Sequence, residues 1–131
     1  MIETETTNTS QATLRGLRMS PRKVRLITNL IRGRRVSDAR LQLQFATKLA
    51  TRPIFKLLQS AVANAVENHG LERDSLVVAS VTVDGGPILY RSQPRAMGRA
   101  TPIRKRTSHV KIVLAGEVDE KNSKIKKQKQ E

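Results

Sequence analysis

The stretch from residue 85 to residue 116 limits the fold of this chain more than any other part. It contains three prolines, seven Lys or Arg residues and no acidic residue. It follows the β-branched run Leu76 to Asp84, and its last part is a second β-rich run, Thr107 to Leu114. Two strands joined in this way predict a long hairpin, over about residues 84–109, that extends past the body of the protein. Because proline is excluded from the middle of a covered sheet, we expect an exposed ribbon.

Upstream of this hairpin, apolar residues recur at helical spacing in three segments. Ser20-Pro21 predicts a helix start with a capping hydroxyl and proline in the first turn, and Gly33 predicts its end. A second helix is expected to start at Ser37-Asp38. The third is expected to open near Thr51 and to stop just before Gly70. Its apolar stripe is the widest of the three, which is typical of a central core helix.

A short strand is expected from Ala12 to Met19. Together these elements predict an α+β fold, in which three helices pack on a small antiparallel sheet with a long protruding β-hairpin arm. One domain is expected over residues 11–115. We expect residues 1–10 to be a disordered lead and residues 116–131 to be a disordered charged tail.

The charge of the chain narrows the class of partner. The net charge is +14, and residues 11–115 alone carry 20 basic and 5 acidic residues. A surface this basic repels itself unless a polyanion covers it, so nucleic acid is the first candidate and an anionic membrane the second. Only three aromatic residues are present, which disfavours a membrane-surface helix and disfavours stacking of single-stranded bases. What remains is recognition of phosphates and shape in a folded or duplex nucleic acid. The absence of cysteine excludes disulfides and zinc knuckles.

The basic residues fall into three groups. The arm contains Arg91, Arg95, Arg99, Arg104, Lys105, Arg106 and Lys111, and arginines favour bidentate phosphate contacts. A second group, with Ser20, is Arg22, Lys23 and Arg25 at the start of the first helix, where free backbone N–H groups bind phosphate well. A third is Arg32, Arg34 and Arg35 at its end. Two alternatives stay open: arm cations that protect a ribbon edge from aggregation, and helix-end arginines that interact with the helix dipole.

Little in the sequence supports catalysis. The two histidines, His69 and His109, are far apart, which does not make a metal site. Ser108 and His109 are adjacent on an expected strand, where neighbouring side chains point to opposite faces. The acidic residues show no pair with an evident reason to converge as general acid and base. We therefore expect no enzyme, no metal and no cofactor.

Several motifs along the chain are distinctive when they are taken together. In the body they are Met19-Ser20-Pro21-Arg22-Lys23-Val24-Arg25-Leu26, Ile31-Arg32-Gly33, Ser60-Ala61-Val62-Ala63-Asn64-Ala65 and Asn68-His69-Gly70-Leu71. In the arm they are Asp84, Gly86-Pro87, Pro94-Arg95-Ala96, Gly98-Arg99-Ala100 and Ile103-Arg104-Lys105-Arg106-Thr107-Ser108-His109. In this order, and over about residues 12 to 115, the chain resembles the L-twenty-two family of large-subunit ribosomal proteins, in its bacterial type.

This resemblance implies a place for each part of the molecule. The family's globular part sits near the mouth of the peptide exit tunnel, and its long hairpin penetrates the ribosomal RNA to line the narrow part of the tunnel. The resemblance also implies early assembly and contacts to several domains of the large-subunit (23S-type) rRNA. The implied partners are this rRNA, neighbouring large-subunit proteins and the nascent peptide, with no membrane. The protein would be a monomer within a cytoplasmic ribosome, and an organellar ribosome remains open.

The resemblance also implies site residues. Those implied for rRNA binding are Arg15, Arg18, Ser20, Arg22, Lys23, Arg25, Arg32, Arg34, Arg35, Arg91, Arg95, Arg99, Arg104, Lys105, Arg106, Thr107, Ser108, His109 and Lys111. Those implied for the tunnel tip are Leu89, Tyr90, Arg91, Ser92, Gln93, Pro94 and Arg95, near which macrolide antibiotics bind. Tyr90 stands where the family commonly has a lysine, and Gln93 stands where a basic or bulky residue is common.

An architectural DNA-binding protein is the alternative. Such a protein inserts paired β-arms into the minor groove, where Pro94 could wedge a base step. It would be a dimer with equal affinity for any duplex, whereas the apolar stripes of this chain are expected to be used up by one three-helix core.

Overall fold

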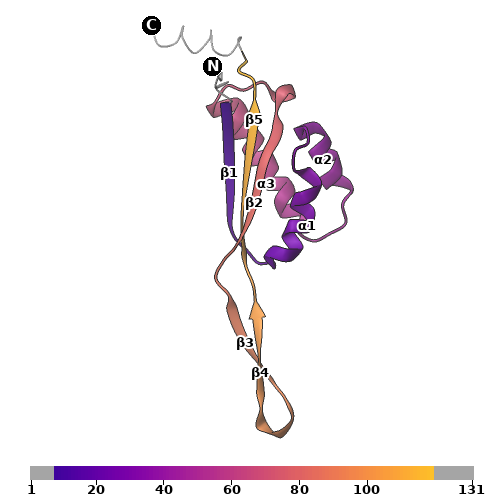
Figure 1. Cartoon of the computed structure of the whole chain (residues 1–131), viewed down its shortest axis with the longest axis vertical. Helices are drawn as coiled ribbons and strands as arrows, with labels where there is room; N and C mark the ends of the chain where they lie inside the picture. Colours follow the sequence, from indigo (N-terminus) through magenta and orange to yellow (C-terminus); the bar gives the residue numbers. More distant parts are fainter. Residues whose placement is uncertain (1–7, 120–131) are drawn as a thin grey trace, which may run out of the picture.

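The computed structural model describes residues 8–119, which form a body of three helices on a sheet and an arm that extends from the body (Figure 1). The strands of the body are β1 (Asn8–Leu17), β2 (Val77–Gly85) and β5 (Ser108–Gly116). The helices are α1 (Pro21–Ile31), α2 (Val36–Phe45) and α3 (Thr51–Ala63), with a π-helical turn Asn64–Asn68 after α3. The arm consists of β3 (Leu89–Pro94) and β4 (Ala100–Lys105). The predicted α+β fold is confirmed.

The helices begin and end close to the predicted residues. Pro21 opens α1, and Gly33 follows its end with a φ of +73° that glycine adopts easily. Ser20 stands at the N-cap, but its side chain makes no capping hydrogen bond. The helix α2 starts at Val36, before the predicted Ser37, because the Val36 side chain is buried and its N–H donates to the Leu76 carbonyl at 3.1 Å.

The third helix supplies the centre of the core, as predicted from its wide stripe. Its buried face consists of Thr51, Ile54, Leu57, Leu58, Ala61 and Val62, and Ala65 continues this face into the π-helical turn. Gly70, with a φ of +64°, follows the turn. The core is completed by Val24, Ile27 and Ile31 of α1 and by Ala39 and Leu43 of α2.

The three-stranded sheet is antiparallel, with the order β1-β5-β2. In the central strand β5, the side chains of Val110, Ile112 and Leu114 are fully buried, whereas Lys111 between them is exposed. Strand alternation therefore separates an apolar face, which the helices cover, from an open polar face (Figure 1).

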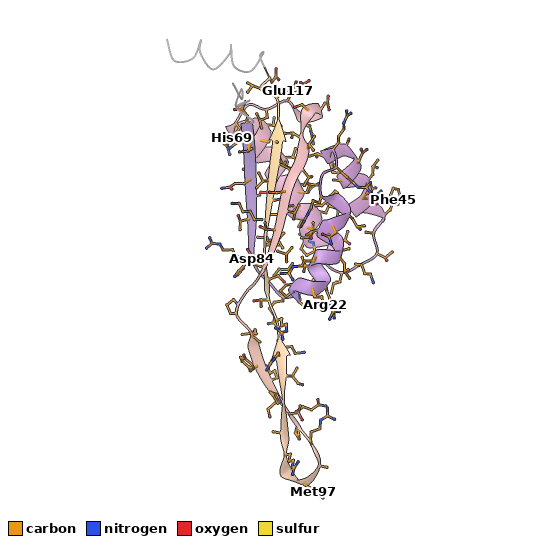
Figure 2. The ribbon with its side chains drawn as sticks, in the orientation of Figure 1. Arg22, Phe45, His69, Asp84, Met97 and Glu117 are labelled. Atoms are coloured by element: carbon orange, nitrogen blue, oxygen red, sulfur yellow. The ribbon has the colours of Figure 1, made fainter. Side chains whose placement is uncertain are left out.

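Beyond the body, β3 and β4 pair only with each other in an antiparallel two-stranded ribbon, from Leu89↔Lys105 to Pro94↔Ala100. The chain reverses at Met97 and Gly98, which both have positive φ, at +61° and +67°. Positive φ at both central positions is what a tight type I′ hairpin turn requires. Met97, which is 96% exposed, therefore marks the far end of the arm (Figure 2).

The residues that the resemblance implies for the tunnel tip, Leu89 to Arg95, lie along the arm and not at its far end, and their role in the tunnel stays a prediction. Leu89 lies at the root of the ribbon, opposite Lys105, and the whole segment Leu89–Pro94 is strand β3. The reversal lies further along the chain, where Met97-Gly98 adopts the turn conformation.

The predictions for the flanking segments are wrong for the residues that the structure describes. Residues 8–10 belong to β1, where Asn8 pairs with Gly116 of β5. After β5, Val118 bridges to Leu71, and the Asp119 N–H donates to the Gly70 carbonyl at 2.9 Å. Residues 8–10 are held by pairing with β5, and Val118 and Asp119 are held by backbone contacts with Leu71 and Gly70. The rest of both predicted segments, residues 1–7 and 120–131, lies outside the described part.

Candidate nucleic-acid interface

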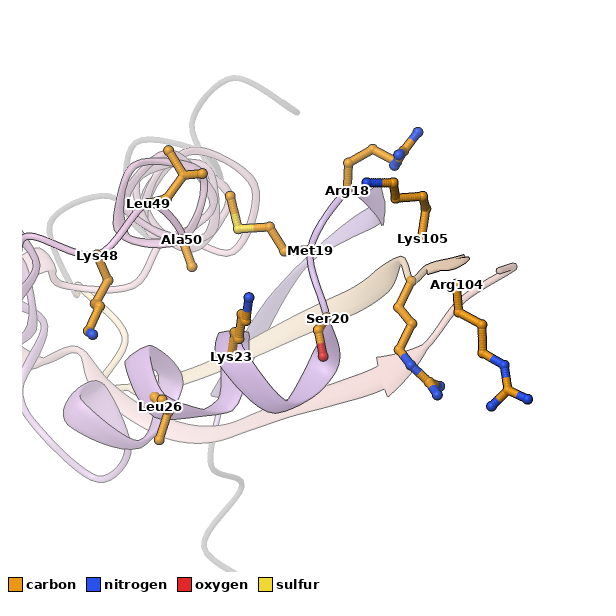
Figure 3. Close-up of a pocket in the computed structure, with 11 residues that line it drawn as sticks. Arg18, Met19, Ser20, Lys23, Leu26, Lys48, Leu49, Ala50, Arg104 and Lys105 are labelled. Carbon is orange, nitrogen blue, oxygen red and sulfur yellow. The ribbon is translucent and has the colours of Figure 1, made fainter. Parts of the chain in front are cut away.

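The structure brings the start of α1 and the root of the arm to the two sides of one hollow, of about 830 Å³ (Figure 3). We call it the arm-root hollow. Six cations line it: Arg18, Lys23, Lys48, Arg104, Lys105 and Arg106. The apolar side chains of Met19, Leu26 and Leu49 line it as well. Two groups that are about 80 residues apart in the sequence thus form one basic surface.

Lys48 is a member of this hollow that the sequence analysis missed. It is exposed in the loop between α2 and α3, and its carbonyl accepts from the Thr51 N–H at 3.1 Å, at the start of α3. A lone lysine in a loop carries no signal of its own. Only the packing of α3 against β1, next to the start of α1, places it beside Lys23.

The arm carries its cations on both faces of the ribbon. Cross-strand partners share a face, and neighbours along a strand point to opposite faces. Arg91 therefore lies on the face opposite to Arg104, which is paired with Tyr90. All residues from Leu89 to Pro102 are exposed, including Arg95 and Arg99 on either side of the turn. An arm with cations on both faces can be neutralised on all sides only if a polyanion surrounds it.

Thr107 and Ser108 do not belong to an exposed interface, and this corrects their prediction as rRNA contacts. The Thr107 side chain is 6% exposed and that of Ser108 is fully buried. Thr107 donates its hydroxyl to the Pro87 carbonyl at 2.6 Å, and Ser108 donates to the Met19 carbonyl. The Thr107 hydroxyl joins the two chain segments at the root of the arm, and the Ser108 hydroxyl joins β5 to the segment before α1, because buried polar groups need a partner inside the protein.

Two of the arginines predicted to bind rRNA donate a hydrogen bond to a backbone carbonyl of the protein itself. Arg25 donates from its guanidinium to the Val83 carbonyl at 2.9 Å, and Arg32 donates to the Val81 carbonyl at 2.7 Å. Both acceptors lie on β2, an edge strand of the sheet, whose outer carbonyls have no strand partner. Arg22, like Arg34 and Arg35 at the far end of α1, is exposed. All of these residues stay predictions as rRNA contacts.

The predicted residues Arg15, His109 and Lys111 lie on a different surface, the open face of the sheet. They line a shallow hollow of about 530 Å³ together with Thr82 and Asp84. The Gly16 N–H donates to His109 Nδ1 at 3.0 Å, so this ring nitrogen is an acceptor. His109 therefore holds β1 to β5 where the strand register shifts.

Among residues 8–119, no group of three or more His, Cys, Asp or Glu side chains could hold a metal ion. In the same range, no helix is long and apolar enough to cross a membrane.

Comparison with known proteins decides the family. A sequence model of ribosomal protein L22p/L17e matches residues 12–115, which is most of the chain. The chain belongs to this family. The protein named "Large ribosomal subunit protein uL22" of Desulfitobacterium hafniense (strain Y51) is 55% identical over 105 residues, which cover 80% of this chain and 92% of that protein. Proteins of the same name match from Thermoanaerobacter sp. (strain X514), at 52% identity over 80% of this chain and 95% of the relative, and from Crocosphaera subtropica, at 48% over 88% and 97%.

The match to the L22p/L17e family runs from β1 through the arm to β5. The resemblance that the motifs carried is therefore confirmed. Since the matching proteins are ribosomal proteins, the chain is not an enzyme, as expected.

Proposed function

We propose that the chain is a structural constituent of the large ribosomal subunit that binds large-subunit rRNA and assists early assembly by contacting several rRNA domains. Membership of the L22p/L17e family and the names of the relatives support the assignment to the large ribosomal subunit. The single observation that carries RNA binding is the arm, which extends outside the body, presents cations on both faces and has no acidic residue from 85 to 116.

The mechanism is neutralisation of phosphates with release of counterions. The arginines of the arm and the six cations of the arm-root hollow replace the ions that condense on RNA, and each neutralised phosphate steepens the salt dependence of binding. The helical body and the arm contact different parts of the RNA because the arm extends away from the body. One chain thereby holds several RNA segments together.

The strand β3 and the turn of the arm are proposed to line the nascent-peptide exit tunnel. The tunnel-facing region comprises the predicted residues Leu89 to Arg95 and, beyond them, the turn at Met97. Neighbouring large-subunit proteins would contact the globular body, and the protein would act as a monomer in the cytoplasmic ribosome. The exposure of all of β3 and of every residue of β4 except the half-buried Ile103 supports this proposal, because an arm that packed on its own body would bury one face.

Sedimentation of the tagged full chain from a lysate on a sucrose gradient, at moderate salt with magnesium, tests membership of the particle. We expect quantitative migration with the large subunit, lost only when high salt or chelation of magnesium dismantles it. Protein at the top of the gradient, or protein released by a DNA-specific nuclease, would contradict the proposal and favour the DNA-binding alternative.

A charge variant tests the root of the arm. Changing Arg104, Lys105 and Arg106 together to Gln is expected to weaken rRNA binding and to flatten the salt slope by up to about 2–3, at roughly 0.7–0.9 for each lost phosphate. The matched control changes Arg40, Lys56 and Arg73, which do not line the arm-root hollow, and is expected to keep the slope. An unchanged slope in the first variant would remove the root of the arm from the RNA interface.

A further inference from the structure

The arm-root hollow combines two kinds of surface that a uniform RNA duplex cannot use together. Its volume of about 830 Å³ lies within the range of sites that enclose a small molecule. A duplex offers phosphates at its surface and keeps its bases in the stack. It would therefore meet the cations of the hollow and leave the apolar lining in water.

The apolar lining is unusually exposed for side chains of its kind. Leu26 is 60% exposed and Leu49 is 81% exposed. Met19 packs against the core, and Lys23 points from α1 toward Met19, whereas Leu49 and Leu26 lie on opposite sides of the hollow (Figure 3). Covering an exposed leucine such as Leu49 is favourable in water, and an apolar or aromatic group of the ligand can do so.

We propose that the arm-root hollow binds one unstacked nucleotide of the RNA, with its base against the exposed Leu49 and its phosphates on the surrounding cations. The inference rests on the proposed function and goes beyond it by naming the RNA feature that this surface selects. No acidic side chain lines the hollow, so the phosphates on either side of the base meet cations alone.

One base held in this way is compatible with the scarcity of aromatic residues. A row of stacked bases needs an aromatic platform, and none of the three aromatic residues lines the hollow. A single base needs only an aliphatic contact, and the cations on the other side of the hollow, Arg104 among them, are available for its phosphates (Figure 3). With few groups that read base edges, the hollow selects an unpaired nucleotide over a paired one, and not a particular base.

A photo-crosslink at position 49 tests the contact. The full chain, with Leu49 replaced by a diazirine-bearing leucine analogue, is bound to full-length large-subunit rRNA, irradiated and mapped by reverse transcription. We expect a crosslink to one unpaired nucleotide. The same analogue in place of Leu41, which is 54% exposed on α2, is the control and is expected not to label that nucleotide. Crosslinks to paired nucleotides only, or none while the RNA remains bound, would overturn the inference.

An affinity measurement separates this inference from the proposed function. Leu49→Asn is expected to weaken rRNA binding about tenfold with an unchanged salt slope, since it removes apolar contact and no phosphate contact. Leu41→Asn is expected to bind like the wild-type chain. Equal affinity of Leu49→Asn and wild type would refute the base contact and leave rRNA binding intact. Failure of the wild-type chain to bind rRNA would refute the proposed function itself.

Discussion

At the scale of single residues, the arm meets the body at a packed joint, which consists of Gly86, Thr107 and Ser108. Thr107 and Ser108 directly follow Arg106, yet both hydroxyls are buried and bonded to backbone carbonyls. Gly86 closes the same joint, and its N–H donates to the Thr107 carbonyl at 2.9 Å. These three residues hold the start of the arm, and the proposed RNA contact is left to the exposed cations beside them.

Removing the hydroxyl of Ser108 tests the joint. Ser108→Ala leaves the partly buried Met19 carbonyl without this donor, so we expect a loss of about 1–3 kcal/mol in the free energy of unfolding. The salt slope of rRNA binding should stay the same. Denaturant unfolding measures the loss, and Ser92→Ala on the exposed arm is the control, expected within about 0.5 kcal/mol of wild type. Weaker rRNA binding with full stability would restore Ser108 as an RNA contact.

A glycine pair at the joint provides a second test. A Cβ at Gly86 would lie 2.5 Å from Thr107 Oγ1 and 3.1 Å from His109 Nε2, whereas at Gly85 the nearest atom is Pro21 Cγ at 4.0 Å. Gly86→Ala is therefore expected to destabilise the fold by about 1–3 kcal/mol through overpacking. Gly85→Ala should remain close to wild type in the same thermal or denaturant unfolding. Equal stability of the two variants would mean that the joint is looser than the structure has it.

At the scale of elements, the arm and the body differ in what holds them. Strand β5 pairs on both edges and packs under the helices. The ribbon of β3 and β4 pairs only with itself, and every residue of β3 is exposed. A lone two-stranded ribbon is at best marginally stable in water. We therefore infer that bound RNA orders the arm and that part of the binding free energy is used for this ordering.

Amide hydrogen exchange on the free protein tests this inference. The amides from Leu89 to Arg99 should exchange with little protection, whereas those of Val110 to Leu114 in β5 should be strongly protected. Protection of the arm is expected to rise when rRNA binds. Strong protection from Leu89 to Arg99 in the free protein would show that the arm is ordered without RNA.

At the scale of the whole molecule, the repulsion between positive charges opposes the stabilisation that the apolar core provides. Residues 11–115 carry 20 basic and 5 acidic residues around one apolar core that involves the three helices and the sheet. Self-repulsion at such a charge destabilises the compact state. The free protein is thus less stable than its core alone would allow, and polyanion binding removes the penalty.

Salt should therefore stabilise the free protein. Raising NaCl from about 0.05 M to about 0.5 M shortens the Debye length from over 10 Å to a few ångströms, which screens the repulsion. We expect the Tm, measured by circular dichroism at fixed pH, to rise by a few degrees. The variant with Arg104, Lys105 and Arg106 changed to Gln should show a smaller rise. A Tm that falls with salt would mean that attractive ion pairs dominate the surface.

Much of the fold could be predicted because its signals are local. The apolar stripe predicts α3, Pro21 and Gly33 predict the two ends of α1, and the acid-free run predicts the arm. Each of these signals concerns only residues that are close together in the sequence. The boundaries that were predicted wrongly, the start of β1 and the start of α2, depend on backbone partners that are distant in the sequence. Asn8 is in a strand because Gly116 pairs with it, and Val36 opens α2 because its N–H reaches the Leu76 carbonyl.

The same distinction holds for the candidate site. The sequence by itself determined the α+β class and the basic arm, and it predicted a polyanionic class of partner, because periodicity and charge are properties of the chain in any conformation. Tertiary structure alone decided that Ser108 is buried, that Arg25 and Arg32 bond the edge of β2, and that Lys48 joins Lys23 and Arg104 in one hollow. Burial and convergence arise from contacts between residues far apart in the sequence, so only the packed fold defines them.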